Sequence, residues 1–310
     1  MREPESEALG ELLEERTHLI NLAFRMLGSA NDAEDVVQQT YVRWFQLDDA
    51  ERAAIERPRA WLTTVASRIC LDILGSARAR RERYVGEWLP EPLPSATAAA
   101  SVTSGVSTAA VDPLDRITLD DSVSMALLVV LESLTPAERV AFVLHEVFSV
   151  PFAEIGEIVG RSPEATRQLA SSARRHIRDL RSRPTDAAEH ARLVTAFRRA
   201  CEVGDLDALV GILDPEVRST SDGGGRVRAA LRPVVGAENV ARFLLGVLRK
   251  AQELSVEERD VNGERGLVVS AGDQVVGTVS LGTKTSGDGG GRIHDIWIVM
   301  NPDKLAAWNR

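Results

Sequence analysis

The chain has 310 residues, a mass of 33.7 kDa and a formal net charge of −9. Hydrophobic residues make up 44% and charged residues 27%, which excludes a mainly disordered chain and predicts two or three domains. No apolar run of about 18 residues is present, and the acidic start MREPESEALGELLEE has no apolar signal core, so we expect neither a membrane span nor secretion.

The chain contains two cysteines, Cys70 and Cys201, which stand 131 positions apart. This spacing excludes a disulfide framework and a multi-cysteine metal site, and it favours the reducing cytoplasm. Both thiols are expected to be buried. The pentapeptide DGGGR occurs twice, at 222–226 and 288–292, but neither copy ends in the GK[ST] of a phosphate-binding loop. We therefore expect no metal and no cofactor.

Positive charge is concentrated in two segments although the net charge is negative. Residues 57–83 and residues 161–183 each contain seven arginines against two acidic residues, so each segment carries +5. Arginine presents a planar fork that suits phosphates and guanine edges. One basic run is usually a solvated helix face, whereas two runs on helices favour nucleic-acid binding.

The first piece, residues 8–93, is predicted to be helical. Apolar residues recur at helical spacing up to Gly28, Asn31 or Asp32 can cap a second helix, and Pro58 fits the first turn of a third. The third helix joins Trp61 to an arginine-rich end, a combination that suits single-stranded DNA. Residues 94–111 lack charge and consist almost entirely of Ala, Ser, Thr, Val and Gly, which predicts a flexible linker.

The second piece, residues 112–183, is predicted to contain a helix-turn-helix. An apolar stripe over 120–134 precedes a capping box at 135–138. A short helix at 152–159, a turn containing Gly160 and a second helix from Pro163 to about Arg181 complete the motif. The N-terminal part of such a second helix reads bases in the major groove. We expect base contacts from Glu164, Arg167, Gln168 and Ser171, phosphate contacts from Arg161, Arg174, Arg175 and Arg178, and a helix cap from Ser162. A helical hairpin inside a larger bundle is the alternative.

The third piece, residues 187–310, is predicted to be an α+β domain. One or two helices, at 188–203 and 205–213, open it, and a further helix at 237–250 interrupts a series of antiparallel strands. Asn262-Gly263 predicts a tight hairpin. The expected strands are 217–220, 227–234, 254–261, 266–270, 275–281 and 293–300.

Two segments resemble the sigma-70 family, in its extracytoplasmic-function type. MLGSANDAEDVVQQTYVRW and RPRAWLTTVASRICLDIL with RARRER are similar to region 2, and LTPAERVAFVLHEVFSVPFAEIGEIVGRSPEATRQLASSARR is similar to region 4. The resemblance implies a bacterial transcription initiation factor that binds core RNA polymerase, at the clamp helices of its largest subunit and at its flap, and promoter DNA. Region 2 would read the −10 element and region 4 the −35 element.

The resemblance assigns roles to residues of the first piece. Asp32, Asp35, Gln38, Gln39 and Trp44 would face the polymerase clamp helices. Trp61, Arg68, Asp72, Arg78, Arg80 and Arg81 would lie near the −10 DNA.

The third piece resembles a SnoaL-like domain of the NTF2-like superfamily, a cone of curved sheet and helices around a pocket. CEVGDLDALVGILDPEV and the residues after it carry this likeness. Sigma factors with such a fused domain form a group to which YVGEWLPEPL, DGGGR and NPDKL also point, and in which the domain is thought to regulate the factor in cis. The residues expected to regulate are Asp222, Gly223, Gly224, Gly225, Arg226, Asn301, Pro302, Asp303, Lys304 and Leu305. The pocket could also bind a small ligand or the chain's own linker.

Two other functions remain open from the sequence. The superfamily includes enzymes, for which the candidates are His294, Asp295 and Asp222; His294 and Asp295 are neighbours on a predicted strand, so only one is expected to point into the cone. A lone histidine on a strand is more often structural, so we expect no catalytic residue. The second alternative is a one-component regulator that senses a ligand and binds DNA by its helix-turn-helix. Such a regulator has no need of the first helical piece.

Overall fold

The computed structural model describes residues 3–81, 84–94, 123–180, 185–249, 254–285 and 289–309, with side chains described for 15–76 in the first range and up to 178 in the third. These residues form two compact units. The first unit contains most of the helical pieces predicted above, up to residue 82 and from 130 to 179. The second unit contains the C-terminal domain together with residues 84–94 and 123–129. The end of the first predicted helical piece and part of the second, on the two sides of the predicted linker, thus belong to the C-terminal unit.

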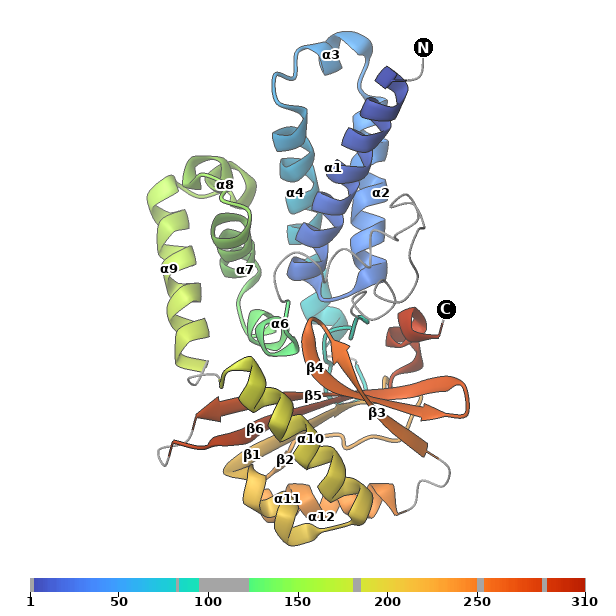
Figure 1. Ribbon diagram of the computed structural model, residues 1–310. Helices are drawn as coiled ribbons and strands as arrows, with labels where there is room; N and C mark the ends of the chain where they lie inside the picture. The colour runs from blue at the N-terminus through green and yellow to red at the C-terminus, as the bar shows by residue number, and fades with distance from the viewer. Residues whose placement is uncertain are drawn as a thin grey trace. The chain divides into compact units, whose positions relative to one another are not determined.

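The first unit begins with four helices, α1 (Glu3–Leu27), α2 (Ala30–Gln46), α3 (Asp49–Ala53) and α4 (Pro58–Arg81) (Figure 1). Helix α2 is capped by Ser29, whose hydroxyl accepts a hydrogen bond from the Asp32 backbone N–H at 3.3 Å. The expectation that Asn31 or Asp32 caps this helix was therefore wrong. The helix begins two residues earlier, and Asp32 lies in its first turn, where its charge complements the helix dipole.

The same unit contains α7 (Pro136–Phe142), the π-helix η3 (Val143–Val147), α8 (Phe152–Val159) and α9 (Pro163–Leu180). Thr135 and Glu138 form the predicted capping box, and the Ser162 hydroxyl accepts from the Ala165 N–H at 3.2 Å to cap α9. Helix α8, a turn with Gly160 in the left-handed conformation, and α9 form the predicted helix-turn-helix. The turn packs so closely that a Cβ on Gly156 would lie 2.6 Å from the Arg161 carbonyl oxygen.

The second unit contains one six-stranded sheet in the order β2-β1-β6-β5-β4-β3. The strands are β1 (Leu213–Asp222), β2 (Val234–Val235), β3 (Leu254–Val261), β4 (Glu264–Ala271), β5 (Gln274–Thr285) and β6 (Gly291–Val299). Asn262 and Gly263, both with positive φ, form the predicted two-residue turn between β3 and β4. Helix α6 (Met125–Glu132) begins in this unit and ends in the first.

Two features of the sheet differ from expectation. Strands β1 and β6 are parallel, because the long connection through α12 (Ala237–Leu248) and three further strands brings the chain back along β1 in the same direction, at the edge opposite β2. Residues 227–233 are not a strand, since only Val234 and Val235 pair with β1. Gly224 and Gly225 have positive φ and start a loop there instead, which ends the strand after Asp222.

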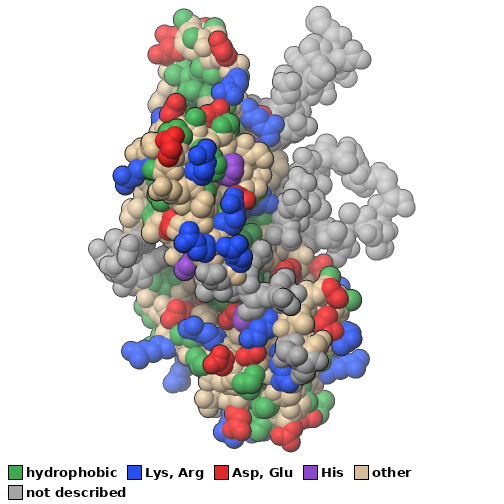
Figure 2. Space-filling view, turned by 90° about the vertical axis from the view of Figure 1, so that its left-hand side faces the viewer, with side chains coloured by type: hydrophobic (Ala, Val, Ile, Leu, Met, Phe, Trp, Pro, Cys, Tyr) green, Lys and Arg blue, Asp and Glu red, His purple; other side chains and the backbone are tan. Residues whose placement is uncertain are grey.

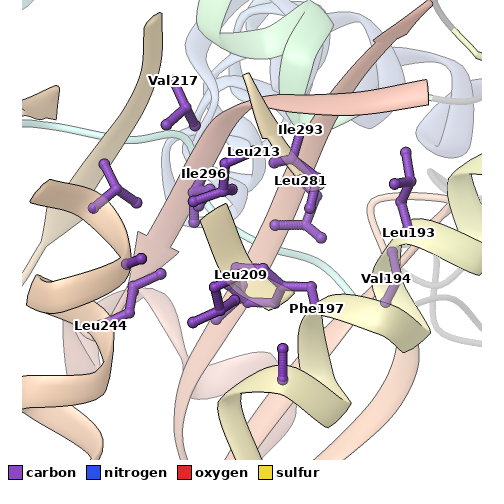
Figure 3. Packing of buried hydrophobic residues seen from close by; sticks show 14 of the residues in the cluster. Leu193, Val194, Phe197, Leu209, Leu213, Val217, Leu244, Leu281, Ile293 and Ile296 are labelled. Atoms are coloured by element: carbon purple, nitrogen blue, oxygen red, sulfur yellow. The ribbon is translucent and has the colours of Figure 1, made fainter. Parts of the chain in front are cut away.

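Helices α10 (Ala187–Val203), α11 (Leu206–Ile212) and α12 lie against one face of the sheet. Their buried side chains, among them Phe197 and Leu209, interdigitate with Leu281, Ile293 and Ile296 of the sheet (Figure 3). A second, smaller cluster occupies the opposite face and consists of Leu89, Met125, Trp297 and Val299. The sheet is therefore buried on both faces, by its own helices and by the described ends of the 84–129 segment.

Candidate functional site

Asp222 is the centre of a hydrogen-bonded cluster in the second unit. Its carboxylate is fully buried and accepts from the Tyr84 hydroxyl at 2.6 Å and from the Leu89 N–H at 2.9 Å. The Gly224 N–H at 3.0 Å and the Lys304 ammonium at 2.7 Å complete its shell. A buried carboxylate with four donors is fully satisfied, which is the condition under which a buried charge is tolerated. The cluster joins three separate parts of the chain, at 84–89, 222–224 and 301–304.

Lys304 and Asn301 reach the 84–94 segment directly. The Lys304 ammonium donates to the Leu89 carbonyl and lies 4.0 Å from the centre of the Trp88 ring, a cation–π distance. The Asn301 amide donates to the Tyr84 hydroxyl at 2.9 Å. Burial and the hydrogen bond to the Asp222 carboxylate raise the pKa of the Tyr84 hydroxyl, so it remains a donor at neutral pH. We call the contacts among Tyr84, Leu89, Asp222, Asn301 and Lys304 the linker clamp.

The glycines of the first DGGGR copy have a steric role in the linker clamp. Gly224 has a φ of +62°, and a Cβ there would lie 2.4 Å from the Asn301 side chain. A Cβ on Gly223 would lie 2.2 Å from the Val227 carbonyl oxygen, and one on Gly225 would lie 3.1 Å from Val85. Only glycine allows the loop to approach this closely. Arg226 is exposed and pairs with Asp303 at 3.1 Å, on the outer side of the same loop.

A second set of contacts holds Pro92 and Leu93, at the C-terminal end of residues 84–94. The backbone N–H of buried Asn262 donates to the Leu93 carbonyl at 2.9 Å, and its side-chain oxygen accepts from the Leu93 N–H. The Trp308 indole N–H donates to the Pro92 carbonyl at 2.8 Å. Pro302 lies in the short helix η4 (Pro302–Lys304), and buried Leu305 precedes η5 (Ala306–Trp308). The C-terminal turns thus supply side chains that contact residues 84–94 near both ends of that stretch.

The described residues also correct the expectation about His294 and Asp295. A register shift between Gly282 and Thr283 leaves His294 as an extra residue in β6. In such a bulge two successive side chains can share a face, and the His294 ring nitrogen lies 3.0 Å from the Asp295 carboxylate. Because flanking Ile293 and Ile296 both belong to the core under the helices, this pair points to the opposite face of the sheet and not into the helix-covered interior.

Helix α2 of the first unit presents a shallow polar hollow. Asp35, Gln38 and Gln39 are exposed there, while Asp32 is half-buried in the first turn. Val42 and Phe45 on the same helix are 55% and 64% exposed, although both are large and apolar. Exposed apolar side chains beside polar ones are typical of a protein-docking surface. Sequence reasoning assigned no role to Val42 or Phe45, and their exposure could not be read from the helical pattern alone.

Trp44 on α2 and Trp61 on α4 contact each other edge to face, with ring centres 5.2 Å apart. Arg68 and Asp72 are exposed on α4, and the Arg68 guanidinium donates to the Glu157 carbonyl of α8 at 3.3 Å. The side chains of Arg78, Arg80 and Arg81 lie outside the described residues. Two tryptophans for which we expected different partners therefore form one aromatic contact between two helices.

Helix α9 presents a basic exposed face. Arg161, Ser162, Glu164, Arg167, Gln168, Arg174, Arg175 and Arg178 are exposed, and Ser171 is half-buried. Buried Ala170, Ala173 and Ile177 anchor the other side of the helix. Figure 2 views the molecule from the side of α8 and α9, and it shows Lys and Arg side chains gathered on the helical part of this face. Hydrogen bonds from the backbone and from Ser162 lower the pKa of the Glu164 carboxyl.

The comparisons with known proteins match this organisation. Residues 12–81 match Sigma-70 region 2, and residues 124–177 match Sigma-70 region 4. The ECF RNA polymerase sigma factor SigJ of Mycobacterium tuberculosis is 40% identical over 304 residues, which cover 94% of this chain and 90% of the relative. This chain belongs to the extracytoplasmic-function sigma factors. It directs RNA polymerase to promoters for transcription initiation, and the one-component regulator is not favoured because region 2 is present.

Two further comparisons extend the family likeness. The probable ECF sigma factor SigI of the same organism is 37% identical over 291 residues, covering 94% of this sigma factor and 92% of the relative. The crystal structure of M. tuberculosis SigJ aligns with a TM-score of 0.72 and 36% identity, over 96% of this chain and 98% of that one. An NTF2-like protein of Pseudomonas putida overlies 36% of the chain with a TM-score of 0.30, a likeness too slight to bear on function.

The two cysteines were expected to be buried thiols. Cys70 is a buried free thiol and Cys201 is a half-buried one. No helix in the described part of this sigma factor is long and apolar enough to cross a membrane. Tyr84, Asn262 and Trp308, for which the sequence suggested no role, each make a hydrogen bond between residues 84–94 and the sheet domain. YVGEWLPEPL and Asn262-Gly263 stood out as motifs, but only the fold brings the two motifs into contact.

Proposed function

We propose that the C-terminal sheet domain regulates this sigma factor in cis by holding the residues that follow region 2 and the residues that begin region 4, on the two sides of the connecting linker. The supporting observation is the linker clamp, in which three separate motifs meet on buried Asp222. Leu89, which follows region 2, and Met125, at the start of region 4, pack in one cluster with Trp297 and Val299. The sheet domain is thus bound to the part of the chain that sets how far region 2 and region 4 can separate.

This arrangement has a consequence for promoter choice. The −10 and −35 elements are separated by a length of duplex that rises about 3.4 Å per base pair. A sigma factor with both linker ends held tolerates fewer spacer lengths than one with a released linker, because each spacer demands its own separation of the two reading domains. In this proposal the linker clamp determines which spacer lengths are tolerated. Its release changes both the amount of transcript and the range of promoters used.

The residue roles within regions 2 and 4 belong to the same proposal. Asp32, Asp35, Gln38, Gln39 and Trp44 contact the polymerase clamp helices, with Val42 and Phe45 adding apolar area. Trp61, Arg68, Asp72, Arg78, Arg80 and Arg81 contact the −10 element. Arg161, Ser162, Glu164, Arg167, Gln168, Ser171, Arg174, Arg175 and Arg178 form the −35 interface, and region 4 also meets the flap of the polymerase.

The sheet domain is proposed to act by packing and not by chemistry. The face under its helices is filled by apolar side chains such as Phe197, Leu209 and Leu281. His294 and Asp295 pair with each other on the opposite face. A small ligand in the domain has no observation in its favour among the described residues.

The experiment is run-off transcription with bacterial core polymerase on templates that vary both promoter elements and the spacer between them. The full chain is compared with a truncation after residue 183 and with Asp222→Ala, and Glu238→Gln serves as the control because its ion pair with Arg242 is exposed and lies outside the linker clamp. We expect the truncation and Asp222→Ala to use a broader range of spacers than the full chain and the control. Identical spacer profiles for all four proteins would overturn regulation through the linker.

A further inference from the structure

The π-helix η3 and the start of α8 hold an arginine of α9. The His145 and Phe152 rings stack with centres 3.9 Å apart and planes inclined by 29°. The Arg167 guanidinium carbon lies over the Phe152 ring, 5.4 Å from the ring centre, which is a cation–π distance. His145, Phe152 and Arg167 therefore form a continuous stack from η3 through α8 to α9.

Backbone groups of the turn after η3 hold the His145 ring in place. The Val150 N–H donates to the Leu144 carbonyl at 2.9 Å, and Ser149 has a φ of +54°, so the chain closes tightly after the π-helix. The His145 ring nitrogen Nδ1 lies 3.2 Å from the Val150 carbonyl oxygen, which fixes the plane of the ring. A π-helical turn inside a helix is uncommon and is often found at functional positions. Here it projects His145 toward Phe152.

Arg167 is supported by an aromatic ring, whereas Arg174 on the same helix is held by an ion pair with Glu146. Arg167 is exposed, as are Arg161, Arg175 and Arg178, for which the described residues include no carboxylate or aromatic partner. A side chain held in one conformation loses less rotamer entropy on binding than a free one. The two-nitrogen fork of arginine discriminates guanine from other bases only when its plane is oriented. A pre-oriented arginine suits base reading, whereas a mobile one suits phosphate contact.

We propose that Phe152 and His145 are positioning residues for promoter recognition, and that they orient Arg167 to read a base of the −35 element. The inference rests on the proposed role of α9 and adds the mechanism by which one of its arginines becomes specific. Phe152 and His145 touch no base in this scheme. They act through Arg167, so their loss relaxes discrimination at one base-pair position and leaves the other positions unchanged.

The experiment uses the full chain with core polymerase and a pool of duplex templates randomised over both promoter elements. Wild type, Phe152→Leu, Arg167→Ala and the double variant are compared by the sequences that each transcribes. Phe148→Leu is the matched control, because Phe148 is the other phenylalanine beside this turn but contacts His18 and Arg25. Phe152→Tyr keeps a ring beneath the guanidinium and tests rescue. Thermal unfolding of each variant reports its stability.

We expect Phe152→Leu to reduce discrimination at one −35 position about two- to fivefold, the worth of an exposed cation–π contact. Arg167→Ala should relax the same position, and Phe152→Leu should add nothing in that background. Phe152→Tyr should restore the preference, and Phe148→Leu should not alter it. An equal loss on all templates, or a Phe152→Leu effect that persists without Arg167, would show that Phe152 is merely structural and overturn the inference.

The design separates two kinds of failure. If Arg167→Ala relaxes a −35 position and Phe152→Leu does not, the positioning role is wrong and the role of α9 stands. If Arg167→Ala leaves every −35 preference intact, Arg167 does not read the element, and the inference fails together with that part of the proposed interface.

Discussion

The Lys304 ammonium lies 2.7 Å from the Asp222 carboxylate, and the side chains are 12% and 0% exposed. The same ammonium donates to the Leu89 carbonyl, and the same carboxylate accepts from the Leu89 N–H. The ion pair therefore grips both backbone groups of one residue in the connecting segment. A buried pair of this kind is weak evidence for stability by itself, but removing one partner leaves the other charge without compensation.

Asp222→Asn should destabilise the sheet domain by about 3 kcal/mol, because it leaves the Lys304 charge largely buried and unpaired. Asp303→Asn removes an exposed ion pair with Arg226 and should cost less than about 1 kcal/mol. Urea unfolding followed by tryptophan fluorescence measures both, since Trp88, Trp297 and Trp308 all lie in this unit. Equal midpoints for the two variants would contradict the central role of Asp222.

Gly224→Ala should destabilise more than Gly289→Ala, although both glycines have positive φ. A Cβ on Gly224 would lie 2.4 Å from the Asn301 side chain, whereas a Cβ on Gly289 would have nothing within 4 Å. The backbone strain, of order 1 kcal/mol, is common to both variants, so the difference between them reports the clash alone. Differential scanning calorimetry should show the lower midpoint for Gly224→Ala; matching midpoints would mean that Asn301 moves aside freely.

The first unit should lose stability as the pH falls from about 6.5 to 4. Burial, helped by the Arg59 charge, lowers the pKa of His18 from 6.5 to about 4. Between these pH values His18 is protonated in the unfolded chain and neutral in the folded one. The contribution of His18 to the free energy of unfolding is therefore fully present above pH 6.5 and is lost as the pH approaches 4. The loss is about 2 kcal/mol after allowance for partial exposure.

His18→Gln should flatten that pH dependence, which chemical denaturation at a series of pH values would measure. His176→Gln, which removes an imidazole from the exposed side of α9, is the matched control and should keep the wild-type slope between pH 6.5 and 4. If the His18 variant retains the wild-type slope, another group is responsible for it.

Glu146→Gln should strengthen non-specific DNA binding by region 4. The Glu146 carboxylate of η3 pairs with the Arg174 guanidinium of α9 and competes with phosphate for it. Freeing one arginine for one more phosphate contact should steepen the dependence of log K on log salt by about 0.9. Binding of the holoenzyme to a random duplex at several salt concentrations gives this slope. Glu157→Gln removes an equal charge from α8 and should leave the slope unchanged.

Phe45→Ser should weaken binding to core polymerase without lowering stability. Phe45 is 64% exposed on α2, beside the polar hollow that contains Gln38 and Gln39. An exposed side chain contributes little to the fold, so the unfolding midpoint should shift by less than about 0.5 kcal/mol. Gel filtration with core polymerase measures the complex. Full binding by the variant would place the docking surface elsewhere on region 2.

The amino-acid sequence by itself determined the helical regions, the helix-turn-helix and the C-terminal α+β domain. These depend on local rules: the Thr135–Glu138 capping box, the Ser162 cap and the Asn262-Gly263 turn each involve residues at most a few positions apart. The family likeness extended this to sigma regions 2 and 4, whose motifs are contiguous segments.

Only the tertiary structure decided which motifs meet and which faces they use. Asp222 and Tyr84 are 138 positions apart, and no local pattern pairs a strand end with a tyrosine at that distance. The bulge that places His294 and Asp295 on one face arises from the register between β5 and β6. The stack of Phe152 on His145 depends on a π-helical turn that a helical hydrophobic pattern does not distinguish from an α-helix. Contacts between distant segments follow from the way the whole chain packs, so their partners were identified only in three dimensions.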